Sequence, residues 1–245
     1  MEDLIASHPQ VSGLRNTGVP EDEGQHLQSV YKTARKNGGP GRFAFSDSAH
    51  LTEVEGQEVT TARARLLESW EPYWDLAKPV LVEKSPPNLL MSRFLQSVFP
   101  DCAFVLVMRH PVAVAGATKK WVRGGSYGSL IAHWLKAYET MVADIPYLDR
   151  VTVIRYEDLL ADPTGVVRRV YSDLELAPHV PSDVAITEGI NDKYFAIWDR
   201  PGLRARRIRE RTTNRFEARV GRFSYGFNSS VPISPLRIEP LHFDP

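Results

Sequence analysis

Residues 103–121 read AFVLVMRHPVAVAGATKKW, and this stretch decides the fold. Residues 103–108 are apolar at every position, which is typical of a strand covered on both faces of a sheet. Pro111 can open a helix over residues 112–122, because proline is favoured in the first helical turn. The stretch therefore predicts a buried strand that passes through a short polar turn directly into a helix.

The same strand–turn–helix unit recurs along the chain. Short apolar runs at residues 79–82 and 151–154 predict two more strands. Helical spacing of apolar residues predicts further helices over residues 61–74, 88–99 (with Asn88 as the N-cap), 130–143 and 164–174. Units of this length predict an α/β fold, with a parallel sheet flanked by helices on both faces.

Length and composition exclude several classes of protein. The chain has 245 residues with 30 basic and 30 acidic side chains, which excludes a uniformly basic nucleic-acid coat protein. Cys102 is the only cysteine, so an internal disulfide or a multi-cysteine metal site is excluded. No apolar run reaches the roughly 20 residues of a membrane span, and the amino terminus lacks a secretory pattern. We expect an intracellular, soluble domain over residues 1–230 and an irregular tail over 231–245.

Residues 199–222 differ in composition from the rest of the chain. They hold nine arginines against Asp199, Glu210 and Glu217. Such a segment suits a flank or lid over an anionic ligand, and it equally suits the solvated face of a helix.

Polar side chains follow all three predicted strands, and in open parallel sheets ligands bind beyond the carboxyl ends of the strands. Arg109 offers a bidentate fork to phosphate, and the helix that follows adds free N–H groups. Lys84 can neutralise a phosphate or an oxyanion as a point charge. The alternative for both residues is an ion pair with a neighbouring carboxylate.

Two blocks together resemble a known family. They are VEKSPPNLLMSRFLQSVFPDCAFVLVMRHPVAVAGATKKW (residues 82–121) and VTVIRYEDLLADP (151–163). They resemble the "EK-S/T-P", "R-D/H-P" and "YEDL…DP" motifs of the sulfotransferases that use 3′-phosphoadenosine-5′-phosphosulfate (PAPS). The bacterial group and the heparan-type Golgi enzymes are the most similar, and the resemblance covers about residues 4–175.

The resemblance implies a P-loop NTPase-like fold and a PAPS site. Arg109 would bind the 3′-phosphate, Tyr156 would lie against the adenine, and Lys84 would lie near the transferred sulfuryl group. A serine that helps the arginine in the family falls on Ala117 here, with Thr118 as a possible substitute. Loss of one hydroxyl contact would weaken phosphate binding by about 1–2 kcal/mol.

The resemblance also implies a catalytic base. Heparan-type enzymes carry a glutamate in a loop soon after an "HP-D-V" segment, and Glu23 matches that position best. Glu21 is the second candidate and His26 the third. The acceptor hydroxyl or amine must lose a proton as it attacks sulfur, and a carboxylate within hydrogen-bond reach can take it. Without the resemblance, residues 21–23 would pass for a solvated acidic turn.

The family's glycine-rich 5′-phosphosulfate loop and its strand find no match in the chain, so we expect them to lie upstream of Met1. On this expectation the chain is a truncated copy that binds PAPS weakly or not at all, unless a partner chain supplies the loop. We expect no metal, no nucleic acid and no membrane partner. The expected acceptor is a small molecule or a glycan, and the expected location is the cytoplasm.

Three other functions are alternatives to sulfuryl transfer. A non-catalytic relative that only binds the nucleotide would fit the absent loop and Ala117. A nucleic-acid-binding module would use the arginines of residues 199–222 and would show a steep salt dependence. A nucleotide kinase would need a Walker-type Gly-x-x-x-x-Gly-Lys-Ser/Thr motif, which the sequence lacks.

Overall fold

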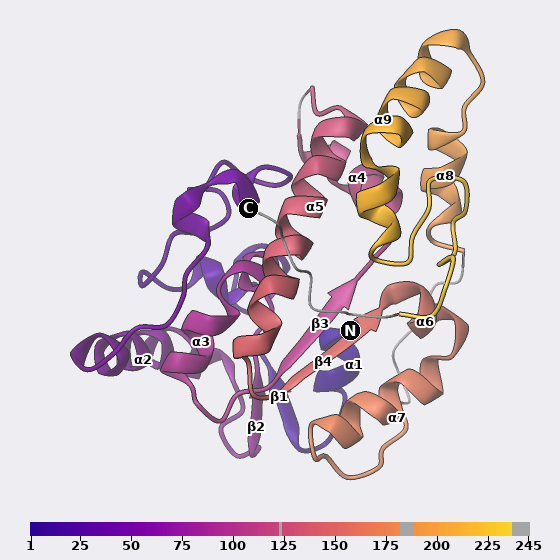
Figure 1. Ribbon diagram of the computed structural model, residues 1–245. Coiled ribbons are helices and arrows are strands. Elements are labelled where there is room, and N and C mark those ends of the chain that lie inside the picture. The colour runs from indigo at the N-terminus through magenta and orange to yellow at the C-terminus, as the bar shows by residue number, and fades with distance from the viewer. Residues whose placement is uncertain (123, 182–188, 237–245) are drawn as a thin grey trace.

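The computed structural model describes residues 1–122, 124–181 and 189–236, and Figure 1 shows the arrangement of its elements. The strands are β1 (Val11–Gly13), β2 (Val80–Val82), β3 (Phe104–Met108) and β4 (Val151–Arg155). The α-helices are α1 (Glu2–Ala6), α2 (Gln57–Trp70), α3 (Ser92–Val98), α4 (Pro111–Thr118), α5 (Tyr127–Asp144), α6 (Tyr156–Ala161), α7 (Pro163–Asp173), α8 (Asp192–Trp198) and α9 (Leu203–Gly221). Short 3₁₀ turns lie at Pro20–Asp22, Gly24–His26, Phe43–Phe45, Asp47–Ala49, Glu71–Tyr73, Pro86–Leu90, Lys119–Trp121 and Ile145–Tyr147.

Parallel strands flanked by helices confirm the predicted α/β class. β1 pairs with β2, and β3 pairs with β4 from Phe104↔Val151 to Met108↔Arg155. Within the described ranges these pairs are two separate sheets, whereas the sequence predicted one. Side chains of α5 take up backbone acceptors of β3 and of the residue after it: the Tyr138 hydroxyl donates to the Val107 carbonyl and Trp134 Nε1 to the Arg109 carbonyl.

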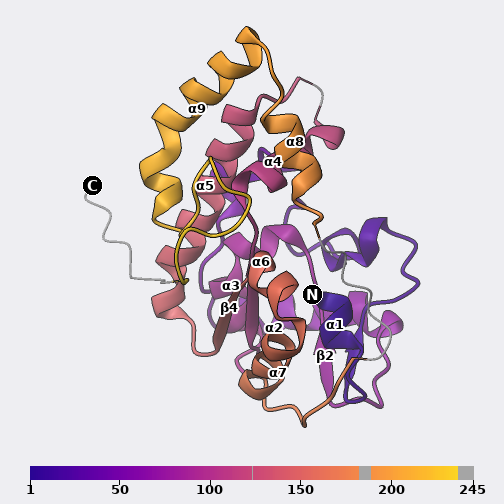
Figure 2. The ribbon, with the colours of Figure 1, turned by 90° about the vertical axis from the view of Figure 1, so that its right-hand side faces the viewer.

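Both faces of β3 are covered, as its continuous apolar sequence predicts. Leu106 and Met108 belong to a core cluster with side chains of α4, α5, α8 and α9. Val105 and Val107 pack on the opposite cluster, which is formed mainly by α1 and α7. In a strand, successive side chains point to opposite faces, so one apolar run anchors two layers of helices (Figures 1 and 2).

Several element boundaries differ from the predicted ones. Asn88 does not cap a helix, because it lies inside the 3₁₀ turn and α3 begins only at Ser92. α5 starts three residues early, at Tyr127, because the Ser126 side chain caps it by accepting from the Ser129 N–H. β1, α6 and α8 were not predicted, and they are short elements of three to seven residues.

The arginine-rich segment forms helix α9, which projects with α8 as an arm at the top of Figure 1. Thr212, Phe216 and Val220 are its buried positions, and the helix packs against α5. Its charge is partly used inside the chain, since Arg206 pairs with Glu210 and Arg219 pairs with Glu139.

Burial of His133 makes the stability of the fold depend on pH. The ring is 8% exposed and lies edge-on to Phe43 and Phe45, and its Nε2 atom has no hydrogen-bond partner. This burial lowers the pKa of His133 to about 4. The unfolded chain therefore binds more protons between pH 6.5 and pH 4, and stability falls as the pH is lowered through that range.

Replacement of His133 by phenylalanine tests this effect. Between pH 7 and pH 5 the wild-type chain should lose about 2 kcal/mol of unfolding free energy from His133 alone. His133→Phe should remove that part, leaving the loss due to other groups such as His110, whose pKa burial also lowers to about 4. Urea denaturation at both pH values measures the difference. Equal losses in the two proteins would contradict the assignment.

Candidate functional site

Side chains at the carboxyl ends of the strands form the candidate site. Lys84, Arg109 and Tyr156 follow β2, β3 and β4 within two residues, and Glu23 lies in a loop that reaches the end of β2. Lys84 Nζ lies 3.4 Å from Glu23 Oε1 and 3.3 Å from the carbonyl oxygen of Glu21. The structure thus brings together two predicted residues that are 61 positions apart in sequence.

Gln25 holds the Glu23 carboxylate in place. Its side-chain amide donates to Glu23 Oε2, and its Oε1 accepts from the Ala34 N–H at 2.8 Å. Gln25 is buried, and its own N–H donates to the Ser85 hydroxyl at 3.0 Å. His26 Nε2 lies 3.7 Å from the same carboxylate. Of the three candidate bases, Glu23 is therefore the one whose side chain is fixed beside Lys84.

Glu83 anchors the loop that carries Glu23. Its Oε1 accepts from the Gly24 N–H at 3.0 Å, and Trp70 Nε1 donates to the Gly24 carbonyl at 3.0 Å. Ser85 and Asn88 also donate to the Glu83 carboxylate. Burial raises the pKa of Glu83, although these hydrogen bonds oppose the shift. No sequence motif indicates that Glu83 or Trp70 supports this loop.

Arg109 lies among aromatic rings rather than in an ion pair. Its guanidinium carbon is 4.8 Å from the Tyr156 ring centroid and 5.4 Å from that of Tyr194. Its Nε donates to Asn191 Oδ1 at 2.9 Å, and its Nη2 is buried without a hydrogen-bond partner. In the part of the chain that the structure describes, Arg109 forms no salt bridge. Arg109 is therefore not paired with a carboxylate among the described residues.

Thr118 and Ala117 lie at the end of α4. The Thr118 hydroxyl donates to the Val114 carbonyl at 2.8 Å, and its methyl group lies close to Gly41. None of the interactions found in the described ranges joins Thr118 to Arg109, so the structure does not bring this predicted residue into the group.

Asn191 and Tyr194 are contacts of Arg109 that the sequence did not reveal. Asn191 lies 82 positions from Arg109, and neither residue belongs to a predicted strand end or to the quoted motifs. A contact at this separation depends on how α8 packs against α4. No local pattern signals that packing.

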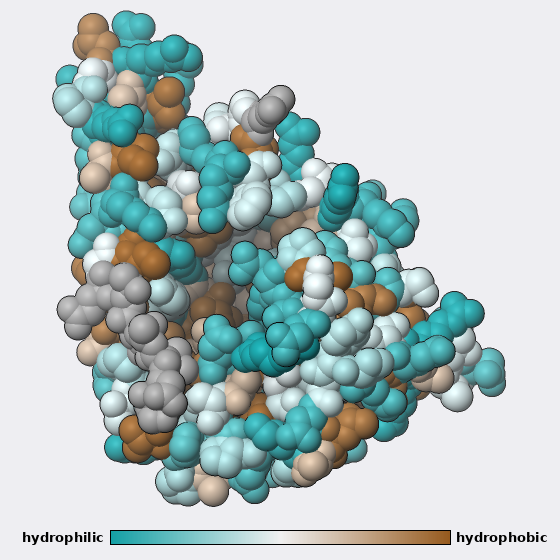
Figure 3. Space-filling view, turned by 180° about the vertical axis from the view of Figure 1, so that it is seen from behind, coloured by the Kyte–Doolittle hydropathy of each residue, from teal (hydrophilic) through white to brown (hydrophobic). Residues whose placement is uncertain are grey.

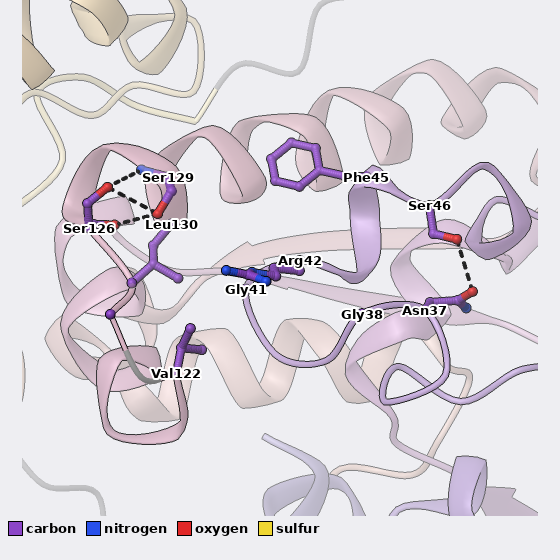
Figure 4. Close-up of a pocket in the computed structure, with 12 residues that line it drawn as sticks. Asn37, Gly38, Gly41, Arg42, Phe45, Ser46, Val122, Ser126, Ser129 and Leu130 are labelled. Atoms are coloured by element: carbon purple, nitrogen blue, oxygen red, sulfur yellow. Dashed lines mark hydrogen bonds between the residues drawn. The ribbon is translucent and has the colours of Figure 1, made fainter.

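The surface of the described residues has hollows outside this group of side chains. Seen from behind, a hollow lies beside the arm of α8 and α9, with apolar side chains inside it (Figure 3). A separate pocket of about 390 Å³ is shown in Figure 4 and is lined by Asn37, Gly38, Gly41, Arg42, Phe45, Ser46, Val122, Gly124, Gly125, Ser126, Ser129 and Leu130. Several of its polar groups bond one another, as Ser126 does with Ser129 and Ser46 with Asn37. None of Glu23, Lys84, Arg109, Thr118 and Tyr156 lines this pocket.

Two kinds of feature are not found among the described residues. They contain no group of three or more His, Cys, Asp or Glu side chains that could hold a metal ion. None of their helices is long and apolar enough to span a bilayer.

Similarity to known proteins identifies the family of the chain. The model of the sulfotransferase family matches residues 1–179. The chain belongs to the sulfotransferase family. The matched range includes Glu23, Lys84, Arg109 and Tyr156, and it ends before α8.

Individual members of the sulfotransferase family resemble the chain more distantly. Two curated relatives, from Mycobacterium bovis and Mycobacterium tuberculosis, are each called omega-hydroxy-beta-dihydromenaquinone-9 sulfotransferase Stf3. Each is 25% identical over 193 residues, which is 71% of this chain and 47% of the relative. The chain thus spans about half the length of these relatives. A sulfotransferase structure from Alicyclobacillus acidocaldarius matches 89% of this chain and 88% of its own, with 18% identity and a TM-score of 0.44.

Substitution of Gly24 tests the anchor of the Glu23 loop. A Cβ atom at Gly24 would lie 2.6 Å from Glu83 Cγ and 2.8 Å from Trp70 Nε1. Gly24→Ala should therefore lower the unfolding free energy by about 1–3 kcal/mol in urea denaturation. Gly128→Ala is the control, because the nearest atom would be 3.8 Å away in helix α5, and it should be neutral or stabilising. Equal stabilities of the two variants would contradict the anchor.

Proposed function

We propose that the chain transfers a sulfuryl group from PAPS to a hydroxyl or amine acceptor by in-line displacement. The observation that carries the proposal is the fixed Glu23–Lys84 pair at the end of β2. Arg109, at the end of β3, supplies a cation without a carboxylate partner in the described ranges. A base beside a cation and a separate phosphate-binding cation are the groups that this reaction needs.

Arg109 and Tyr156 would hold the nucleotide of PAPS. The unsatisfied, buried Nη2 of Arg109 fits a phosphate, because guanidinium groups bind phosphate oxygens through charge-assisted hydrogen bonds. Tyr156 already lies against the guanidinium and is half-buried, so part of its ring is free to contact the adenine. PAPS supplies the sulfuryl group, and these side chains place it.

Glu23 and Lys84 would then act on the reacting groups. Glu23 accepts the proton of the acceptor hydroxyl as the oxygen of that hydroxyl bonds to sulfur. The bond between sulfur and the bridging phosphate oxygen breaks, and adenosine 3′,5′-bisphosphate leaves with that electron pair. Lys84 balances the negative charge that spreads over the sulfuryl and bridging oxygens, which is the main electrostatic demand of such a displacement. Gln25 keeps Glu23 in position throughout.

The acceptor is proposed to be a hydroxyl compound. The two curated relatives are named for an omega-hydroxy-beta-dihydromenaquinone-9, so a hydroxyl group of a lipid is the first acceptor to test. Small phenols and glycans follow in a panel.

Nucleic-acid binding by α9 is not favoured by the contacts of its arginines. Arg209 donates to the carbonyls of Trp198 and Arg200, and Arg215 lies over the Phe216 ring. With the ion pairs of Arg206 and Arg219, four of the arginines are engaged within the chain. Nucleotide binding without catalysis remains the competing function, and turnover separates it from the proposal.

Replacement of Glu23 tests the proposed reaction. Glu23→Gln should lower transfer of ³⁵S from labelled PAPS to the hydroxyl panel by about 10²–10⁴-fold, because the base is lost while the shape is kept. Its affinity for adenosine 3′,5′-bisphosphate in calorimetry should stay within about two-fold. Glu21→Gln is the matched control, since the Glu21 side chain is exposed and only its backbone carbonyl contacts Lys84, and it should retain transfer.

Two outcomes would contradict the proposal. Transfer that survives Glu23→Gln at the wild-type rate would remove Glu23 from the mechanism. Binding of the bisphosphate by the wild-type chain, with no transfer to any member of the panel, would instead support the non-catalytic relative.

A further inference from the structure

The guanidinium of Arg109 depends on a segment that lies outside the residues matched by the family. Residues 191–194 contribute an amide that accepts from Arg109 Nε and a ring that lies over the guanidinium. The match to the family ends at residue 179. The contacts of residues 191–194 with Arg109 therefore lie outside the part of the chain that identifies the family.

The orientation of the Asn191 amide is set by its two partners. Asn191 is 4% exposed, and its Nδ2 donates to Glu157 Oε1 at 2.7 Å. A carboxylate can only accept, so the NH₂ group must face Glu157 and the carbonyl oxygen must face Arg109. The hydrogen bonds therefore run in one direction, from Arg109 to Asn191 to Glu157. These hydrogen bonds exclude the flipped orientation of the Asn191 amide.

Glu157 is fixed in turn by two further donors. The His110 N–H donates to its Oε1 at 3.0 Å, and the Tyr225 hydroxyl donates to its Oε2 at 2.7 Å. Burial, with the adjacent Glu157 charge, raises the pKa of Tyr225, so the phenol stays a donor. The buried carboxylate has no cation in direct contact among the described residues, and Arg109 is the cation closest to it in the hydrogen-bond chain.

Tyr194 is held against α4 by the absence of a side chain at Gly116. A Cβ atom there would lie 2.6 Å from Tyr194 Cδ1. The ring therefore packs directly on α4, at Gly116, which is one position before Ala117. Tyr156 and Tyr194 together limit the directions in which the Arg109 guanidinium can swing.

We propose that Asn191 and Tyr194 are positioning residues that hold the Arg109 guanidinium in the orientation that binds the 3′-phosphate of the nucleotide. This inference rests on the proposed function, because it takes PAPS as the donor. Asn191 occupies Nε on one side, which leaves the Nη edge of the fork for phosphate oxygens. The buried Nη2, which lacks a partner, is the donor that a phosphate would satisfy. The ring of Tyr194 keeps that edge from turning away.

The test compares two nucleotides that differ only in the 3′-phosphate. Calorimetry on the full chain measures adenosine 3′,5′-bisphosphate and adenosine 5′-monophosphate. The wild-type chain should prefer the bisphosphate, and Arg109→Ala should abolish the preference. Asn191→Ala should weaken bisphosphate binding at least 10-fold and leave monophosphate binding within two-fold. A merely structural defect would weaken the binding of both nucleotides to the same extent.

Two more variants keep the result decisive. Thr152→Val is the control, because Thr152 is equally buried and donates to Asp173 at the far end of β4, so it should lose stability and keep the nucleotide preference. Tyr194→Ala removes a half-buried ring without stranding a buried polar group. It should reduce the preference several-fold, and it carries the test if Asn191→Ala does not fold.

The possible failures are distinguishable. If Arg109→Ala abolishes the preference while Asn191→Ala and Tyr194→Ala both keep it, the positioning inference is wrong and the proposed function stands. If the wild-type chain binds both nucleotides alike, the 3′-phosphate site itself is wrong, and the inference falls with it.

Discussion

The buried carboxylate of Glu157 is the interaction on which the arrangement of the site depends. It receives hydrogen bonds from the His110 N–H, the Asn191 amide and the Tyr225 hydroxyl. These donors come from the start of α4, the segment before α8 and the segment after α9. A buried charge is costly unless its hydrogen bonds are satisfied, so the three segments are held to one point at the end of β4. Loss of one donor would strand part of the carboxylate.

A second glutamate, the half-buried Glu83, has a similar role in the other half of the site. Glu83 follows β2 directly and binds the Gly24 N–H, as well as Ser85 and Asn88. Each glutamate acts through one intermediate residue. Glu83 holds the Gly24 peptide next to Glu23, and Glu157 holds the Asn191 amide next to Arg109. In both places a glutamate carboxylate fixes the neighbour of a side chain that is proposed to contact the substrate.

The strand ends explain why so much of the site could be predicted and why part of it could not. Lys84, Arg109 and Tyr156 follow apolar runs, and in open α/β sheets ligands bind beyond the carboxyl ends of the strands. Glu83 and Glu157 stand beside predicted residues in the same motifs, but nothing in the sequence indicates that their side chains turn inward. Thr118 is adjacent to Ala117 in sequence, yet its hydroxyl donates to the Val114 carbonyl within α4. Neighbours in a helix point in different directions, so adjacency in sequence is a weak guide there.

The sequence by itself determined the class of fold and the family. Apolar runs of strand length that end in polar turns predict parallel strands, because the periodicity of the side chains along the backbone is a local property. Only the tertiary structure decided that Glu23 meets Lys84 and that Asn191 and Tyr194 reach Arg109. It also decided that the strands within the described ranges form two pairs. These outcomes depend on how distant segments pack. Many side chains contribute to the free energy of that packing, so no single position in the sequence predicts it.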